Sequence, residues 1–129
     1  MKDIQVPISP GELLDKITIL RIKAARMSDA AKVANVKHEL GLLEKTWKDS
    51  GAAAVNLGTA EAELTQVNEK LWVIEDEIRD EERAKRFTEK FVELARAVYF
   101  TNDERAAIKK RVNTLLGSTI VEEKSYQQY

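Results

Sequence analysis

Ile8-Ser9-Pro10-Gly11-Glu12-Leu13 is the clearest helix start in the chain. Ser9 can accept a hydrogen bond from a free amide of the first turn, and Pro10 stands where a helix needs no amide hydrogen. Glu12 follows the serine by three residues, so the segment has the form of a capping box with an apolar residue on each side. We therefore expect a helix that begins at Ser9 or Pro10 and runs to about Met27.

Apolar residues at alternating steps of three and four continue from this start through most of the chain. Such a stripe marks the buried face of an amphipathic helix. The stripes predict helices over residues 10–27, 29–49, 59–78 or beyond, 87–100 and 101–117. The expected fold is all-α, with about five amphipathic helices in a bundle of hairpins. We expect one helical domain over residues 1–129.

The junctions between the stripes carry their own signals. Ser28-Asp29 leaves almost no linker, and these residues prefer helix caps, which favours a hairpin of the first two helices over one kinked helix. Thr59 is expected to cap the third helix. Thr101 and Glu104 have the spacing of a second capping box, which predicts that a fifth helix starts there.

Both ends of the chain are expected to be short extended arms. Apolar and polar residues alternate over residues 4–8, and Pro7 restricts this segment to an edge strand or an arm. The tail, residues 118–129, starts with Thr119-Ile120-Val121, a β-branched run that could pair with the N-terminal arm.

Composition excludes several functions. The net charge is −1, with 21 basic and 22 acidic residues, so there is no basic excess for a nucleic-acid partner. The chain has no cysteine and only one histidine, His38, which argues against disulfides, thiolate chemistry and zinc sites. We expect no metal and no cofactor. Neither a signal peptide nor a membrane span is visible, so the expected location is the cytoplasm.

Four strings carry a resemblance to a known family: Val6–Leu20, Leu71–Arg79, Thr101–Arg105 and Leu116–Tyr126. Together they resemble a family of short bacterial proteins of unknown function, nearly end to end. The resemblance implies a single-domain bacterial protein of a kind found near surface-polysaccharide and glycosyltransferase genes. The family carries no accepted catalytic residues, so the resemblance implies none here.

A first candidate site involves Arg26 and Lys37. Their spacing resembles that of the cations on the long helix of all-helical chorismate mutases, where they bind substrate carboxylates. Ser28-Asp29 should interrupt that helix, and the other residues of the pattern are not at matching positions. We interpret both residues as solvated cations on successive helices.

A second candidate site is acidic. Asp76 with Asp80, and Glu77 with Glu81, stand four residues apart, a spacing that aligns carboxylates for magnesium in small all-α nucleotide pyrophosphohydrolases. These residues lie off the neighbouring apolar stripe, whereas such enzymes turn their carboxylates inward. We therefore interpret the run as a solvated charged face.

A third candidate site could bind a ligand or a partner. Trp72, Glu75 and Arg79 follow one another at helical spacing and offer an apolar wall and a guanidinium fork for an anion. We expect Asn102 and Arg105 nearby, because free amides at the start of a fifth helix would attract an anion. Lys16 lies on a similar polar stripe of the first helix. The alternative is that Glu75 pairs with Arg79 or Arg96 and the groove is closed.

Two functions remain open. Nothing resembles a phosphate loop, a nucleophile elbow or a metal cluster, which favours a non-enzymatic interaction or accessory protein, a homodimer or the partner of another protein. The alternative is a small all-α enzyme that acts on an anionic metabolite, of the chorismate mutase or the magnesium-dependent pyrophosphohydrolase kind.

The capping box makes a direct prediction about stability. Replacing Ser9 with alanine should lower the free energy of unfolding by about 1 kcal/mol, because one amide of the first turn loses its acceptor. Urea denaturation of both proteins measures the difference. An unchanged midpoint in Ser9→Ala would contradict the cap.

Overall fold

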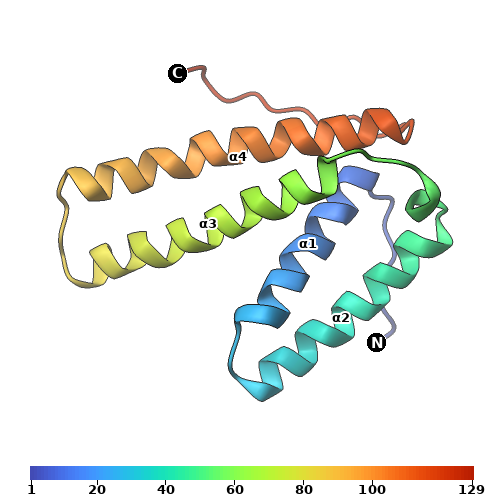
Figure 1. Cartoon of the computed structure of the whole chain (residues 1–129), viewed down its shortest axis with the longest axis horizontal. Helices are drawn as coiled ribbons and strands as arrows, with labels where there is room; N and C mark the ends of the chain where they lie inside the picture. The colour runs from blue at the N-terminus through green and yellow to red at the C-terminus, as the bar shows by residue number, and fades with distance from the viewer.

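Four α-helices form two antiparallel hairpins that cross each other in the computed structural model, which describes all residues 1–129 (Figure 1). The first hairpin consists of α1 (Pro10–Arg26) and α2 (Ala30–Asp49), and the longer second one of α3 (Ala60–Arg83) and α4 (Glu89–Leu115). A short 3-10 helix, η1 (Ala52–Ala54), lies between the hairpins. The all-α prediction is therefore confirmed, and no residue forms a strand.

The start of α1 follows the prediction. The Ser9 hydroxyl accepts a hydrogen bond from the Glu12 amide at 3.2 Å, and Pro10 is the first helical residue. After Arg26 the chain turns, and Asp29 caps α2 by accepting from the Lys32 amide at 3.0 Å. The first two helices therefore form a hairpin and not a kinked helix.

The predicted count of about five helices is wrong, because residues 89–115 form one continuous helix. Thr101 does not cap a new helix but lies in the middle of α4, where its side chain is only 1% exposed. It stands seven residues from both Leu94 and Ile108, which are also buried. Burial of this stripe against α3 outweighs the local capping preference of the threonine.

The structure also differs from the expectations at Thr59 and Phe87. The α3 helix does begin after Thr59, but the Thr59 hydroxyl donates to the Glu63 carboxylate at 2.8 Å and caps no amide. Phe87, the first residue of the helix expected over residues 87–100, precedes α4 and is 57% exposed in the turn between α3 and α4.

The expected pairing of the two arms is wrong. Residues 1–9 and 118–129 have no regular structure, and the tail runs back along α4 and forms no strand with the N-terminal arm (Figure 1). The tail is held by side chains: Lys124 forms an ion pair with Asp103 at 3.3 Å, and the Tyr129 hydroxyl donates to the same carboxylate.

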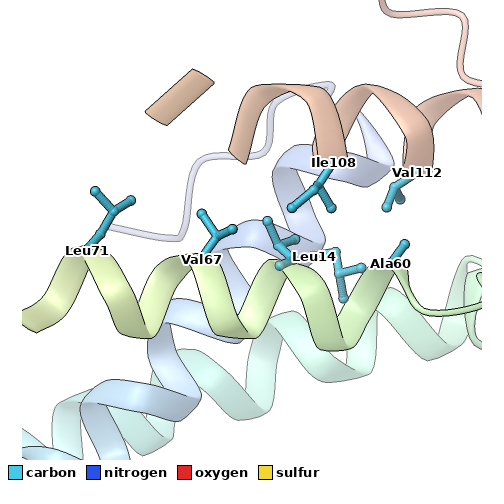
Figure 2. Packing of buried hydrophobic residues seen from close by; sticks show 7 residues of the cluster. Leu14, Ala60, Val67, Leu71, Ile108 and Val112 are labelled. Carbon is cyan, nitrogen blue, oxygen red and sulfur yellow. The ribbon is translucent and has the colours of Figure 1, made fainter. Parts of the chain in front are cut away.

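The hydrophobic core lies where α1 crosses the second hairpin. Figure 2 shows Leu14 of α1 between side chains of α3 and α4. The cluster consists of Leu14, Ala60, Leu64, Val67, Leu71, Ile108 and Val112. Only 21 of the 129 residues are buried, so large parts of the helices remain exposed.

The first turn of α1 rests directly on the backbone of α4 at Gly11. The Gly11 amide donates to the Asn113 side-chain oxygen at 2.6 Å. A Cβ atom at Gly11 would overlap the Lys109 carbonyl oxygen and lie 2.8 Å from the Asn113 oxygen. The absence of a side chain is therefore a condition for this helix contact.

Gly11 and Gly41 should respond to alanine in opposite directions. Gly11→Ala should lower the free energy of unfolding by about 1–3 kcal/mol, because the α1–α4 contact must open. Gly41, in the exposed part of α2, has open space around its missing side chain. Gly41→Ala should raise the free energy of unfolding by up to about 1 kcal/mol, because alanine has the higher helix propensity. Urea denaturation measures both, and equal effects would contradict a close contact at Gly11.

Candidate functional site

Charged side chains from α1, α4 and the tail meet around Lys109. The Lys109 ammonium forms ion pairs with Glu12 and, at 3.7 Å, with Glu122 of the tail. The Ser9 hydroxyl also donates to Glu122. Ser9 is 2% exposed and the Lys109 side chain 16% exposed, so the Glu122 carboxylate contacts two groups that are mostly shielded from water.

Two more cations act on Glu12. Partial burial raises the pKa of Glu12, but the hydrogen bond and the charge of Lys109 lower it, and the charges of Lys16 and Arg105 add to them. The net result is a pKa below the usual value of 4.5. We call Ser9, Glu12, Lys16, Arg105, Lys109 and Glu122 the Lys109 cluster.

A cavity of about 580 Å³ lies beside this cluster, between the tail and α4. Lys109 and Glu122 belong to its wall. The wall also includes Ala106, Ala107, Lys110 and Asn113 of α4 and Ile120 and Val121 of the tail. The cavity therefore combines apolar surface with several charged groups, as ligand sites commonly do.

A second cavity, of about 380 Å³, lies between the start of α1 and the end of α2. Trp47, Leu13 and Leu116 contribute to its wall, which contains no charged side chain. An apolar group fits this cavity better than an anion does.

A buried polar network connects α1 to α3. The Asn68 amide nitrogen donates to the Asp15 carboxylate at 2.9 Å and to the Thr18 hydroxyl at 3.0 Å, and that hydroxyl donates to the Asp15 carbonyl at 2.8 Å. All three residues are at most 5% exposed. The sequence analysis did not single out Asp15 or Thr18, although two polar residues beside the apolar stripe of α1 are a visible signal. Because these groups satisfy one another, the network positions α1.

The residues expected to bind a ligand are not all in one contact network. Lys16 and Arg105 belong to the Lys109 cluster. Glu75 and Arg79 pair with each other along α3, and the Arg79 side chain is 69% exposed, which matches the alternative of a paired stripe. Trp72 is half-buried on α3.

The expectation that a helix starts beside Asn102 and Arg105, with free amides that attract an anion, is wrong. Asn102 and Arg105 lie in the middle of α4, where the helix itself uses the backbone amides. No free helix start is therefore present there to attract an anion.

The acidic run of α3 pairs with nearby cations. Glu81 is 5% exposed and contacts Arg86 at 2.7 Å and Lys90 at 3.5 Å. The hydrogen bond from Arg86 is the largest influence on the pKa of Glu81, which is lowered. No three histidine, aspartate or glutamate side chains in the chain are grouped so that they could hold a metal ion.

The outer half of the α3–α4 hairpin extends beyond α1 (Figure 1). On α3, Trp72 follows Asn68 by four residues and so shares the face that contacts α1. On α4, Phe91 and Val98 precede Lys109 by 18 and 11 residues, about five and three helical turns, so the three residues share a face. Past α1 this face carries Trp72, Phe91 and Val98, which are half-buried. It also carries the Glu75–Arg79 ion pair, which follows Trp72 along α3.

A family model described as "Family of unknown function (DUF6165)" matches residues 4–129. No curated protein and no solved structure matches the chain. None of the four helices is both long and apolar enough to cross a membrane.

The lowered pKa of Glu12 predicts a pH-dependent contribution to stability. A carboxyl group with a lower pKa in the folded state stabilises the fold above its unfolded value, near 4.5, and loses this effect as the pH falls through the folded value. Glu12→Gln should therefore be less stable than the natural chain at pH 7, and the difference should shrink towards pH 3. Urea denaturation at both pH values tests this. A constant difference would contradict the role of the charge.

Proposed function

We propose that this chain, which belongs to the family of unknown function DUF6165, is a non-enzymatic accessory protein that acts by associating with a second copy of itself. The observation that carries the proposal is the uncovered outer half of the α3–α4 hairpin. The inner half of the same face is covered by α1, an amphipathic helix, and we expect a helix of the same kind to cover the outer half.

The proposal is supported by the apolar side chains of the uncovered face. On this face Trp72, Phe91 and Val98 are half-buried, and Phe87 at the hairpin turn is exposed. The Phe87 and Phe91 rings are in edge-to-face contact, with centroids 5.2 Å apart. A two-helix hairpin with an apolar stripe commonly buries it against further helices, as in a four-helix bundle.

The charges of the hairpin turn and of α1 have opposite signs, which supports a second copy of the chain as the partner. Residues 75–93, around the hairpin turn, contain eight carboxylates and five cations. Residues 10–26, which form α1, contain four cations and two carboxylates. If two copies pack antiparallel about a two-fold axis, the acidic turn of each hairpin lies near the basic α1 of the other.

The proposal includes the pathway and the cellular location in which this accessory protein acts. The resemblance to short bacterial proteins suggests a role beside the enzymes of surface-polysaccharide biosynthesis, and composition suggests a cytoplasmic location. An additional protein partner would then dock on the assembled dimer.

One observation favours the second candidate, a small all-α enzyme that acts on an anionic metabolite. The cavity beside Lys109 has the size and the mixed wall of a ligand site. However, outside the Lys109 cluster, the side chains around this cavity do not place a nucleophile beside a base. Self-association therefore stays the leading proposal.

The proposal predicts a dimer that depends on the hairpin turn. At high micromolar concentration the chain should sediment at twice its mass of 14.6 kDa. Phe87→Glu should weaken association at least about tenfold, or 1.4 kcal/mol, because it places a charge on the apolar face. Phe87 is exposed, so the fold should persist, which circular dichroism checks.

Leu42→Glu is the matched control, because Leu42 is also an exposed apolar residue but lies on α2. It should sediment like the natural chain. A natural chain that remains a monomer, or equal effects of the two substitutions, would contradict the proposed interface.

A further inference from the structure

We infer that the cavity between the tail and α4 binds a small molecule with an anionic phosphate or carboxylate group, and that Glu122 occupies its anion position when no ligand is present. This inference concerns a different surface from the self-association face. It therefore does not depend on whether the chain forms a dimer.

The anion position is built from side chains. The Ser9 hydroxyl and the Lys109 ammonium both contact the Glu122 carboxylate, and both are mostly shielded from water. The amides at the start of α1 are already used, since Gly11 donates to Asn113 and Glu12 donates to Ser9. Recognition thus depends on one hydroxyl and on cations, not on a free helix end.

The charge balance favours an anion once Glu122 moves away. On the helices, Lys109 is paired with one carboxylate, that of Glu12, and the charges of Lys16 and Arg105 also lower the pKa of Glu12. The tail adds Glu122 to this group and places Glu123 in the cavity wall. Without the Glu122 carboxylate the cavity wall keeps Lys109, Lys110 and Lys124 against Glu123. This leaves an excess of positive charge, which an anionic ligand can neutralise.

The cavity wall offers unused binding groups. Lys110 forms no ion pair, and the Asn113 amide nitrogen forms no hydrogen bond, because only the oxygen of that side chain is engaged. The alanines of α4, with Ile120 and Val121 of the tail, supply apolar surface for the rest of the molecule. A ligand with one anionic end and a less polar body matches this wall.

The tail is attached in a way that permits its displacement. After Ser118 it forms no backbone–backbone hydrogen bond with any other part of the chain. Its far end is held by Tyr129, whose ring lies 5.4 Å from that of Tyr99 and 4.6 Å from that of Phe100, between centroids. A ligand can therefore replace Glu122 while the aromatic contact keeps the tail beside α4 as a cover.

The alternative is that Glu122 only fastens the tail. Both interpretations predict a looser tail when Glu122 is replaced by glutamine. Only a ligand site predicts a gain in anion affinity, because Glu122→Gln removes the competing charge while it keeps a similar side-chain shape.

The test is a titration of the ¹⁵N-labelled full chain with pyrophosphate at constant ionic strength, followed by amide chemical shifts. Binding should move the signals of Gly11, Asn113 and residues 118–124 and should saturate. Glu122→Gln should bind about tenfold more tightly than the natural chain. Malonate, titrated in the same way, distinguishes a site that accepts carboxylates from one that accepts only phosphates.

Substitutions of lysine supply the controls. Lys109→Gln should abolish saturable binding, Lys109→Arg should retain it, and Lys37→Gln on the exposed face of α2 should leave it unchanged. If Lys109→Gln fails to fold, Glu122→Gln alone decides. The inference is overturned if Glu122→Gln gains no affinity, or if pyrophosphate shifts the signals of exposed lysines throughout the chain without saturation.

Discussion

The first turn of α1 lies against the backbone of α4, where the amide of Gly11 donates to the side chain of Asn113. Only glycine permits this approach, because a side-chain carbon there would overlap the Lys109 carbonyl oxygen. The same contact places Leu14 in the core between α3 and α4, and it brings Glu12 to Lys109. The core and the charged cluster therefore both depend on one close helix contact.

The crossing of α1 also divides the second hairpin into two parts with different chemistry. Beside α1 the surface is charged, and the tail covers it through Glu122, Lys124 and Tyr129. Beyond α1 the same helices present partly exposed aromatic and aliphatic side chains. The first part suits a small anion and the second suits a helical partner, so binding of a ligand and self-association can be separated by substitution.

Local patterns predicted the elements better than their junctions. The capping box at Ser9 and the cap at Asp29 act within a few residues, so both could be predicted from the chain. The capping box at Thr101 failed because its threonine also belongs to a buried stripe, and packing against α3 decided between the two possibilities. For the same reason the fourth and fifth expected helices are one helix.

The candidate site was predicted only in part. Lys16 and Arg105 were expected near a ligand, and they do lie in one charged cluster, but Trp72, Glu75 and Arg79 belong to a different region of contacts. Ser9, Lys109 and Glu122 are far apart along the chain, and no spacing connects them. By itself the sequence determined an all-α fold, the start of α1 and the first hairpin, because caps and apolar periodicity are local properties. Only the tertiary structure decided which side chains meet at Lys109 and which helix faces stay uncovered, because both depend on where α1 crosses the second hairpin.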